Sequence, residues 1–171
     1  MYKADMYQKD IFSINYDKLK KIGIKVLVYD LDNTIIEKEK NVIDDKVKKL
    51  FNKLKNDFKI IIISNTWNKK KIEYVSKELN VSYIMNARKP FKYGYNKAKL
   101  LSHTSASSIC MIGDQLLTDV GGAKKMGYYC CLVDPLHQRE LIFTKFNRLI
   151  EYFIFKRLNK KYNIRRGSYY D

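Results

Sequence analysis

Short, nearly all-apolar runs alternate with amphipathic stretches along most of this 171-residue chain. The runs lie at Lys25–Tyr29, Phe58–Ile63, Val81–Met85, Ser108–Ile112 and Tyr128–Val133. Between them, apolar side chains recur at helical spacing, as at Val47, Leu50, Phe51 and Leu54. Such runs are typical of parallel strands covered on both faces. The alternation predicts an α/β fold with a doubly wound, Rossmann-like parallel sheet of five strands.

Polar and charged side chains follow the predicted strands. They are Asp30 and Asp32 after the first strand, Ser64 and Asn65 after the second, Lys89 past the third and Asp114 after the fourth. Ligands of open α/β sheets bind in the crevice beyond the carboxyl ends of the strands. We therefore expect these residues to converge on one site, although each alone would be an ordinary turn or helix-cap residue.

The types of these residues favour phosphoryl transfer. Of two carboxylates separated by one residue, Asp30 can attack as a nucleophile while Asp32 gives and takes a proton. A dianionic phosphate monoester would be repelled by both carboxylates, and Mg²⁺ relieves that repulsion by binding their oxygens together. Asp114 supplies a third carboxylate, and Ser64 and Lys89 can bind phosphoryl oxygens.

Four ordered motifs carry a resemblance to a known family. They are Asp30-x-Asp32-x-Thr34, Ser64-Asn65, Lys89-Pro90 and Gly113-Asp114-x-x-x-x-Asp119. In this order the chain resembles the haloacid dehalogenase (HAD) superfamily of phosphotransferases from about Ile24 to Pro135. The sequences of the motifs are most similar to those of the YqeG branch of subclass IIIA, which is related to phosphatidylglycerophosphate phosphatases.

The resemblance implies a role for each motif residue. The implied metal ligands are Asp30, which is also the nucleophile, the backbone carbonyl of Asp32, and Asp114. Asp32 would be the general acid and base. The implied phosphate-binding groups are Ser64, the backbone of Asn65, and Lys89. Thr34 is the residue typical of phosphatases at its position, and Asp119 would orient Lys89 or bind a metal-bound water.

The intervals between motifs leave no room for an inserted cap domain. One helix and one strand fill the interval from Thr34 to Ser64, and the same holds from Ser64 to Lys89. We therefore expect a capless, open site that takes a large substrate or borrows a lid from a partner subunit.

The alternation ends after Pro135. We predict a HAD-like catalytic domain over residues 1–136, with a helical lead-in at 1–23, and a basic amphipathic helix and tail over 137–171. The helix is expected from His137 to Leu158. Its apolar stripe comprises Ile142, Phe146, Leu149 and Phe153, widened by Phe143, Ile150, Ile154 and Leu158. The stripe can pack on the core or a second subunit, or residues 138–166 can contact an anionic membrane surface.

Charge and cysteine content bear on partners and location. The chain has 34 Lys and Arg against 18 Asp and Glu, a net charge of +16. This charge favours polyanionic partners, although a low-GC genome would also enrich lysine. Cys110, Cys130 and Cys131 fall in strand-like runs without metal-ligand spacing, which indicates reduced core cysteines. No run approaches the length of a membrane span. We expect a cytoplasmic protein, peripheral at the inner membrane face if it binds lipid.

The expected function is a Mg²⁺-dependent phosphate monoester hydrolase with an aspartyl-phosphate intermediate at Asp30. Phosphatidylglycerophosphate or another large phosphorylated molecule is the expected substrate. Two alternatives stay open: an RNA- or ribosome-associated binding or assembly factor, and a nucleic-acid end phosphatase. The oligomeric state does not follow from the sequence.

Overall fold

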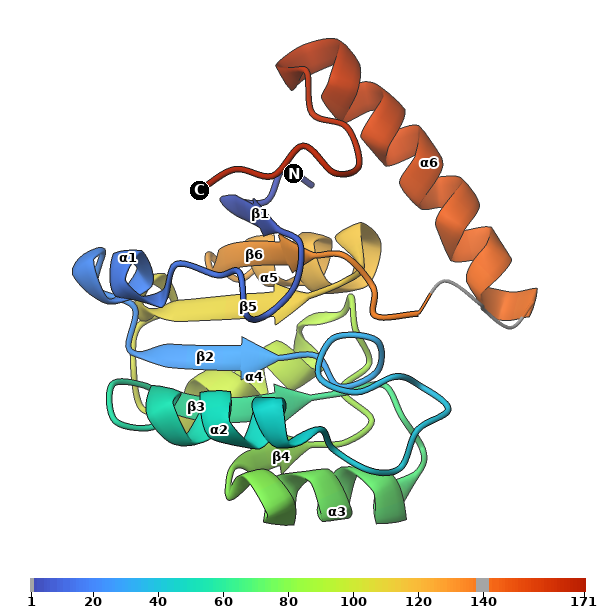
Figure 1. Ribbon diagram of the computed structural model, residues 1–171. Helices are drawn as coiled ribbons and strands as arrows, with labels where there is room; N and C mark the ends of the chain where they lie inside the picture. Colours follow the sequence, from blue (N-terminus) through green and yellow to red (C-terminus); the bar gives the residue numbers. More distant parts are fainter. Residues whose placement is uncertain (1, 138–141) are drawn as a thin grey trace.

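The structure, a computed structural model, describes residues 2–137 and 142–171, with the side chains of 142–148 outside the description. Six parallel strands form one sheet in the order β1-β6-β5-β2-β3-β4 (Figure 1). The strands are β1 (Met6–Gln8), β2 (Val26–Tyr29), β3 (Lys59–Ile63), β4 (Ser82–Ile84), β5 (Ile109–Gly113) and β6 (Tyr129–Val133). The predicted α/β class and parallel sheet are confirmed.

The prediction of five strands was wrong, because the lead-in at 1–23 contributes a sixth. β1 adds to the edge of the sheet, with Met6 in register with Cys131 of β6. Three residues are too few to show a period of two, and the pairing partner lies far along the chain. Helical structure in the described part of the lead-in is confined to α1 (Tyr16–Lys21).

Helices cover both faces of the sheet, as a doubly wound fold requires (Figure 1). One face packs against α1, α2 (Asp45–Leu54) and α3 (Lys69–Leu79). The other packs against α4 (Lys92–Ser102), the short α5 (Gly121–Lys124) and part of α6 (Ile142–Tyr162). Polar side chains begin the helices where expected: Asp44 accepts the Lys46 N–H at 2.8 Å, and Asn68 accepts the Lys71 N–H at 3.1 Å.

Successive strand residues divide between the two cores. In β3, Ile60 and Ile62 belong to one hydrophobic cluster, and Ile61 and Ile63 to the other. Burying such a side chain stabilises the fold by roughly 1.5–3 kcal/mol. Cys130 and Cys131 likewise face opposite sides, as their extended conformation predicts.

The C-terminal segment returns to the sheet edge. Beyond α6, the backbone of Tyr170 exchanges two hydrogen bonds with Tyr7 of β1, at 2.7 and 2.9 Å, so the N- and C-terminal segments meet there (Figure 1). The predicted start of α6 at His137 adjoins residues 138–141, which lie outside the described part, and the helix continues to Tyr162 rather than ending at Leu158. Among the described residues, no helix combines the length and the apolar character needed to cross a membrane.

The buried face of α6 differs from the predicted stripe. Leu149 and Phe153 were placed on one stripe with Leu158, yet their exposed fractions are 54% and 58%. Leu158 is buried, together with the acidic side chain of Glu151. The helix therefore meets the core along a line through 151 and 158, which is rotated away from the stripe that the sequence suggested.

Candidate active site

The site lies at the topological switch point of the sheet, where the connections from neighbouring strands lead in opposite directions. β2 and β5 are neighbours; from this pair β3 and β4 extend to one side, and β6 and β1 to the other. Asp30 directly follows β2 and Asp114 directly follows β5, at the carboxyl ends of two hydrogen-bonded strands. A crevice opens at such a switch point, which explains why residues 84 positions apart meet.

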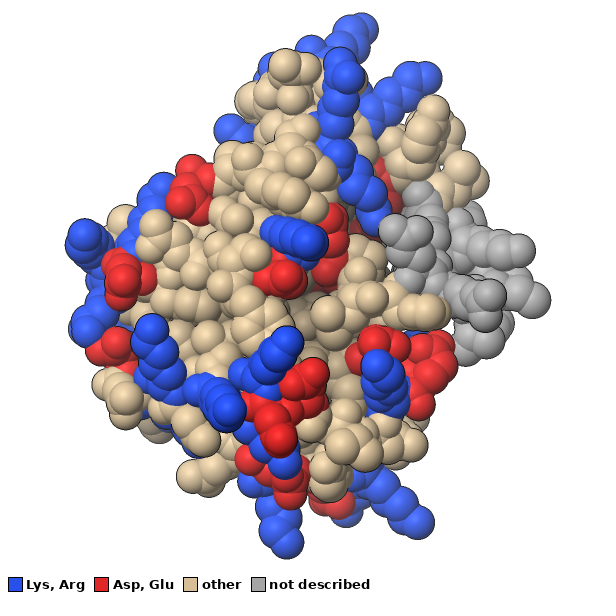
Figure 2. Space-filling view, viewed as in Figure 1, with Lys and Arg blue, Asp and Glu red and all other residues tan. Residues whose placement is uncertain are grey.

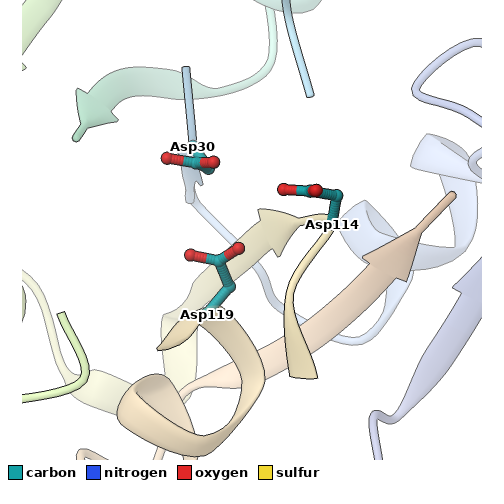
Figure 3. Close-up of side chains that lie close together, drawn as sticks. All are labelled: Asp30, Asp114 and Asp119. Carbon is teal, nitrogen blue, oxygen red and sulfur yellow. The ribbon is translucent and has the colours of Figure 1, made fainter. Parts of the chain in front are cut away.

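Three buried carboxylates converge in this crevice. Asp30, Asp114 and Asp119 point toward one another, and one oxygen from each lies within 4.8 Å of the others (Figure 3). Asp119 belongs to the π-helical turn η2 (Leu116–Val120), and we refer to residues 114–119 as the catalytic turn. Gly113 permits this approach, since a Cβ atom there would overlap the Asp119 carboxyl group.

Lys89 provides the positive charge of the site. Its buried ammonium donates to Asp30 Oδ1 at 2.5 Å and to Asp119 Oδ1 at 2.6 Å. The Asn65 side chain binds the backbone of Lys89. Its Nδ2 donates to the Lys89 carbonyl at 2.9 Å, and its Oδ1 accepts the Lys89 N–H at 2.7 Å. The second and third motifs are thus joined by a side chain that the sequence analysis assigned only a backbone role.

The electrostatics favour a bound cation. Burial raises the pKa of Asp30 to about 7, and Asp119 adds to the rise while Lys89 opposes it. Burial also raises the pKa of Asp114 well above its usual value, assisted by Asp30 and Asp119. Burial lowers the pKa of the Lys89 ammonium, but Asp119 and Asp30 outweigh it and the net shift is upward. One ammonium does not neutralise three carboxylates, so this all-oxygen set suits a hard divalent cation.

Asp32 lies apart from the three carboxylates. Its Oδ1 accepts from the Lys71 ammonium at 2.6 Å, and it lines the same cavity as Asp30. Lys71 also donates to the carbonyls of Lys38 at 2.7 Å and Glu37 at 3.3 Å. The lysine therefore joins Asp32 to the loop that follows the first motif.

Of the remaining predicted residues, Ser64 lines the cavity and Thr34 lies beside Asp114. Ser64 is buried directly after β3, and its hydroxyl accepts the Thr66 N–H at 3.1 Å. Thr34 is also buried, and its hydroxyl donates weakly to Asp114 Oδ1 at 3.4 Å. The cavity has a volume of 390 Å³ and is open to the surface. Its lining comprises Asp30, Asp32, Asn33, Lys38, Ser64, Asn65, Thr66, Trp67, Lys89, Gln115 and Thr118.

Sequence reasoning missed several residues at or near this site. Lys71 lies four positions before the buried Val75, which places it on the apolar face of the helix. A lysine on that face could have been recognised as one with a buried partner. Trp67, whose exposed fraction is 84%, stands at the cavity rim with no periodicity to mark it. Glu151 is a lone acid among the basic residues of α6, and its position opposite the catalytic turn depends on tertiary contact alone.

Comparison with known proteins gives concordant results. The family model described as "Mitochondrial PGP phosphatase" matches residues 4–137, which include every motif residue. "Probable phosphatase YqeG" from Bacillus subtilis (strain 168) is 34% identical over 164 residues, 95% of each chain. An uncharacterized Listeria monocytogenes serotype 4b structure covers 77% of this chain and 99% of its own, with 14% identity and a TM-score of 0.53. The putative HAD-hydrolase YfnB from Bacillus subtilis bound to magnesium covers 61% and 50%, with 19% identity and a TM-score of 0.49.

The fold, the four motifs and the curated relative together define a phosphatase of the haloacid dehalogenase superfamily. The resemblance seen in the sequence is therefore confirmed. Within that superfamily, the chain belongs to the family of the mitochondrial PGP phosphatase model, to which it is matched over more than three quarters of its length.

Proposed function

We propose that this phosphatase hydrolyses phosphate monoesters with the help of Mg²⁺ and through an aspartyl-phosphate at Asp30. The observation that carries the proposal is the position of the Asp30 carboxylate on the cavity wall, between the Lys89 ammonium and Asp114. Asp30, Asp114 and the backbone carbonyl of Asp32 would hold the metal. Bound there, Mg²⁺ would offset the charge of carboxylate and phosphate oxygens.

The chain's own residues would carry out both half-reactions. Asp30 attacks the phosphorus atom, the phosphorus–oxygen bond to the leaving group breaks, and Asp32 gives its proton to the departing oxygen. Water then attacks the phosphorus atom of the aspartyl-phosphate while Asp32 takes a proton from that water. The bond from phosphorus to the Asp30 oxygen breaks, which restores the Asp30 carboxylate and releases inorganic phosphate. Lys89 and the Ser64 hydroxyl bind the phosphoryl oxygens as negative charge develops on them, together with the Asn65 backbone.

We further propose that the substrate is a large molecule and that phosphatidylglycerophosphate is the favoured candidate. The intervals between motifs hold only α2 and β3, then α3 and β4, so no inserted domain covers the cavity. An open site suits a headgroup presented at a membrane from the cytoplasmic side. The description of the matched family, "Mitochondrial PGP phosphatase", supports the lipid substrate and not the cytoplasmic side.

We propose α6 as the contact surface for anionic lipid. Its exposed apolar face comprises Leu149, Tyr152 and Phe153. The exposed basic residues beside it are Lys156, Arg157, Lys160 and Lys161. Figure 2 shows basic side chains gathered over α6 at the top of the view. Apolar side chains flanked by lysine and arginine favour binding to an anionic bilayer surface.

The net charge of +16 also favours a second candidate, a substrate or partner of nucleic acid. A phosphate-release panel separates the candidates: phosphatidylglycerophosphate in vesicles, end-phosphorylated oligonucleotides, phosphopeptides and nucleotides. We expect the fastest release from the lipid. Faster release from an oligonucleotide, or salt-sensitive RNA binding without lipid hydrolysis, would replace the lipid assignment.

The chemistry has its own test with a generic aryl phosphate. We expect hydrolysis only when Mg²⁺ is added, and a loss of at least about 10³-fold in Asp30→Asn, because the amide cannot attack phosphorus. Activity of Asp30→Asn close to that of the unchanged protein would reject the covalent mechanism.

A further inference from the structure

The buried carboxylate of Glu151 lies outside the four motifs and in the segment that the sequence separated from the catalytic domain. Its side chain is 8% exposed, on a helix whose neighbouring side chains are mostly basic or apolar. A buried carboxylate is costly unless it is hydrogen-bonded or paired. The hydrogen bonds of Glu151 therefore indicate its structural role.

Glu151 binds the backbone of the catalytic turn. Its Oε1 accepts the Leu116 N–H at 2.6 Å, across 35 positions of sequence. Leu116 is the first residue of η2, so this N–H has no acceptor within the helix. The preceding amide is held from inside, because Asp119 Oδ2 accepts the Gln115 N–H at 3.1 Å. Two adjacent amides of the turn are thus each held by a carboxylate, one from within the turn and one from α6.

The position of Glu151 is itself secured by the C-terminal tail. Arg166 Nη2 lies 3.7 Å from Glu151 Oε2. The next residue, Gly167, donates its N–H to the Tyr7 hydroxyl at 3.0 Å, and Tyr170 pairs with the Tyr7 backbone. Tail, α6 and catalytic turn therefore form one connected set of contacts that reaches from the sheet edge to Asp114 and Asp119.

We propose that Glu151 is a positioning residue of the active site, which holds the catalytic turn so that Asp114 and Asp119 face Asp30. Glu151 is not among the residues that line the cavity, and it acts through the Leu116 amide. The C-terminal helix is then part of the catalytic unit rather than an appended segment. An effect of Glu151 on Mg²⁺ affinity is expected only if the proposed Mg²⁺-dependent reaction is right. The contact between Glu151 and the turn does not depend on that proposal.

Three variants of the full chain separate the hydrogen bond from the charge. Glu151→Leu removes the acceptor oxygen. Glu151→Asp keeps the charge on a side chain that is one methylene shorter. Glu151→Gln keeps an acceptor oxygen on a side chain of the same length but removes the charge. Leu100→Ser is the matched control, because Leu100 is 73% exposed on α4 and belongs neither to the active site nor to the proposed lipid surface. Each variant is compared with the unchanged protein.

The first measurement is amide hydrogen exchange of peptides that span residues 114–120. We expect faster exchange in Glu151→Leu and, to a smaller extent, in Glu151→Asp, with normal exchange in Glu151→Gln and Leu100→Ser. This readout needs neither metal nor substrate. Unchanged protection of the turn in the Leu and Asp variants would overturn the proposal, and if Glu151→Leu does not fold, Glu151→Asp decides.

The second measurement is the Mg²⁺ concentration that gives half of the metal-induced rise in Tm, without substrate. Loss of a residue that supports metal ligands typically costs ~10-fold or more in metal affinity. We expect about a 10-fold increase in that concentration for Glu151→Leu and little change for Glu151→Gln. A lower Tm with an unchanged Mg²⁺ midpoint would reduce Glu151 to a stabilising contact and overturn the positioning role. If the unchanged protein shows no response to Mg²⁺, the proposed function fails, and hydrogen exchange still decides whether Glu151 holds the turn.

Discussion

Lys89 is the residue on which the charge arrangement of the site depends. Its ammonium contacts two carboxylates, and the third, Asp114, has only the weak Thr34 hydroxyl as a side-chain hydrogen-bond donor within the described residues. Burial keeps water from screening these charges, so the metal-free site favours taking up a proton. A divalent cation, if bound as proposed, would therefore compete with a proton for the same surplus of negative charge.

This competition predicts how stability depends on pH. The pKa of Asp30 is raised from 3.8 to about 7, so its stabilising contribution is complete below the unfolded value and is lost as pH rises through about 7. Asp114 and Glu151 shift in the same direction. We expect the Tm of metal-free protein to fall between about pH 4 and about pH 7, and Mg²⁺ to restore it mainly at the upper end.

Thermal unfolding with and without Mg²⁺ across this range checks the prediction. Asp30→Asn is the control, since it removes one titrating carboxyl and should flatten the metal-free curve. A metal-free Tm that rises steadily over the same range would contradict the assignment of these groups.

At the scale of elements, the sequence predicted what depends on local pattern. Buried parallel strands are apolar throughout, so β2, β3 and β5 were located to within a residue or two, and the motif residues followed from their ends. What depends on distant contact was missed. β1 is defined by pairing with β6, and the buried face of α6 is set by what Glu151 and Leu158 meet. Residues joined only by folding, such as Lys71 with Asp32, leave little trace in a single sequence.

The contact between α3 and the first motif yields a second prediction. Lys71→Met removes the only side-chain partner that Asp32 has among the described residues, and leaves the Lys38 carbonyl without its donor. We expect kcat for an aryl phosphate to fall about 10-fold with KM little changed, because Asp32 would no longer be oriented toward the leaving group. The unfolding free energy should drop by about 1–3 kcal/mol.

Lys71→Arg is the informative companion variant, since it keeps the charge and the donors. It should recover most of kcat. Equal losses in the Met and Arg variants, or a change in KM alone, would indicate that Lys71 does not orient Asp32.

At the scale of the whole molecule, α6 has one buried and one exposed apolar face, and we propose a function for each. Glu151 and Leu158 point to the core, while Leu149, Tyr152 and Phe153 remain exposed. Exposed aromatic and aliphatic side chains beside four basic residues are the feature that supports interfacial binding.

Vesicle flotation tests this surface. We expect the protein to float with anionic vesicles, and Phe153→Ser to reduce the bound fraction several-fold, because a large apolar side chain no longer enters the bilayer interface. Leu100→Ser is the matched control, since Leu100 is 73% exposed on α4, away from this face. Equal binding by both variants would remove α6 as the lipid contact.

The pairing of Tyr7 with Tyr170 has a consequence for synthesis on the ribosome. Tyr7 lies far ahead of Tyr170 in the chain, so the outer edge of β1 stays unpaired until the segment that contains Tyr170 has been synthesised. Until then the nascent chain carries an open strand edge, which is a template for unwanted association. Closure of this edge and the contact of Glu151 with the catalytic turn both depend on residues that follow β6, so the sheet gains both only after all six of its strands have been made.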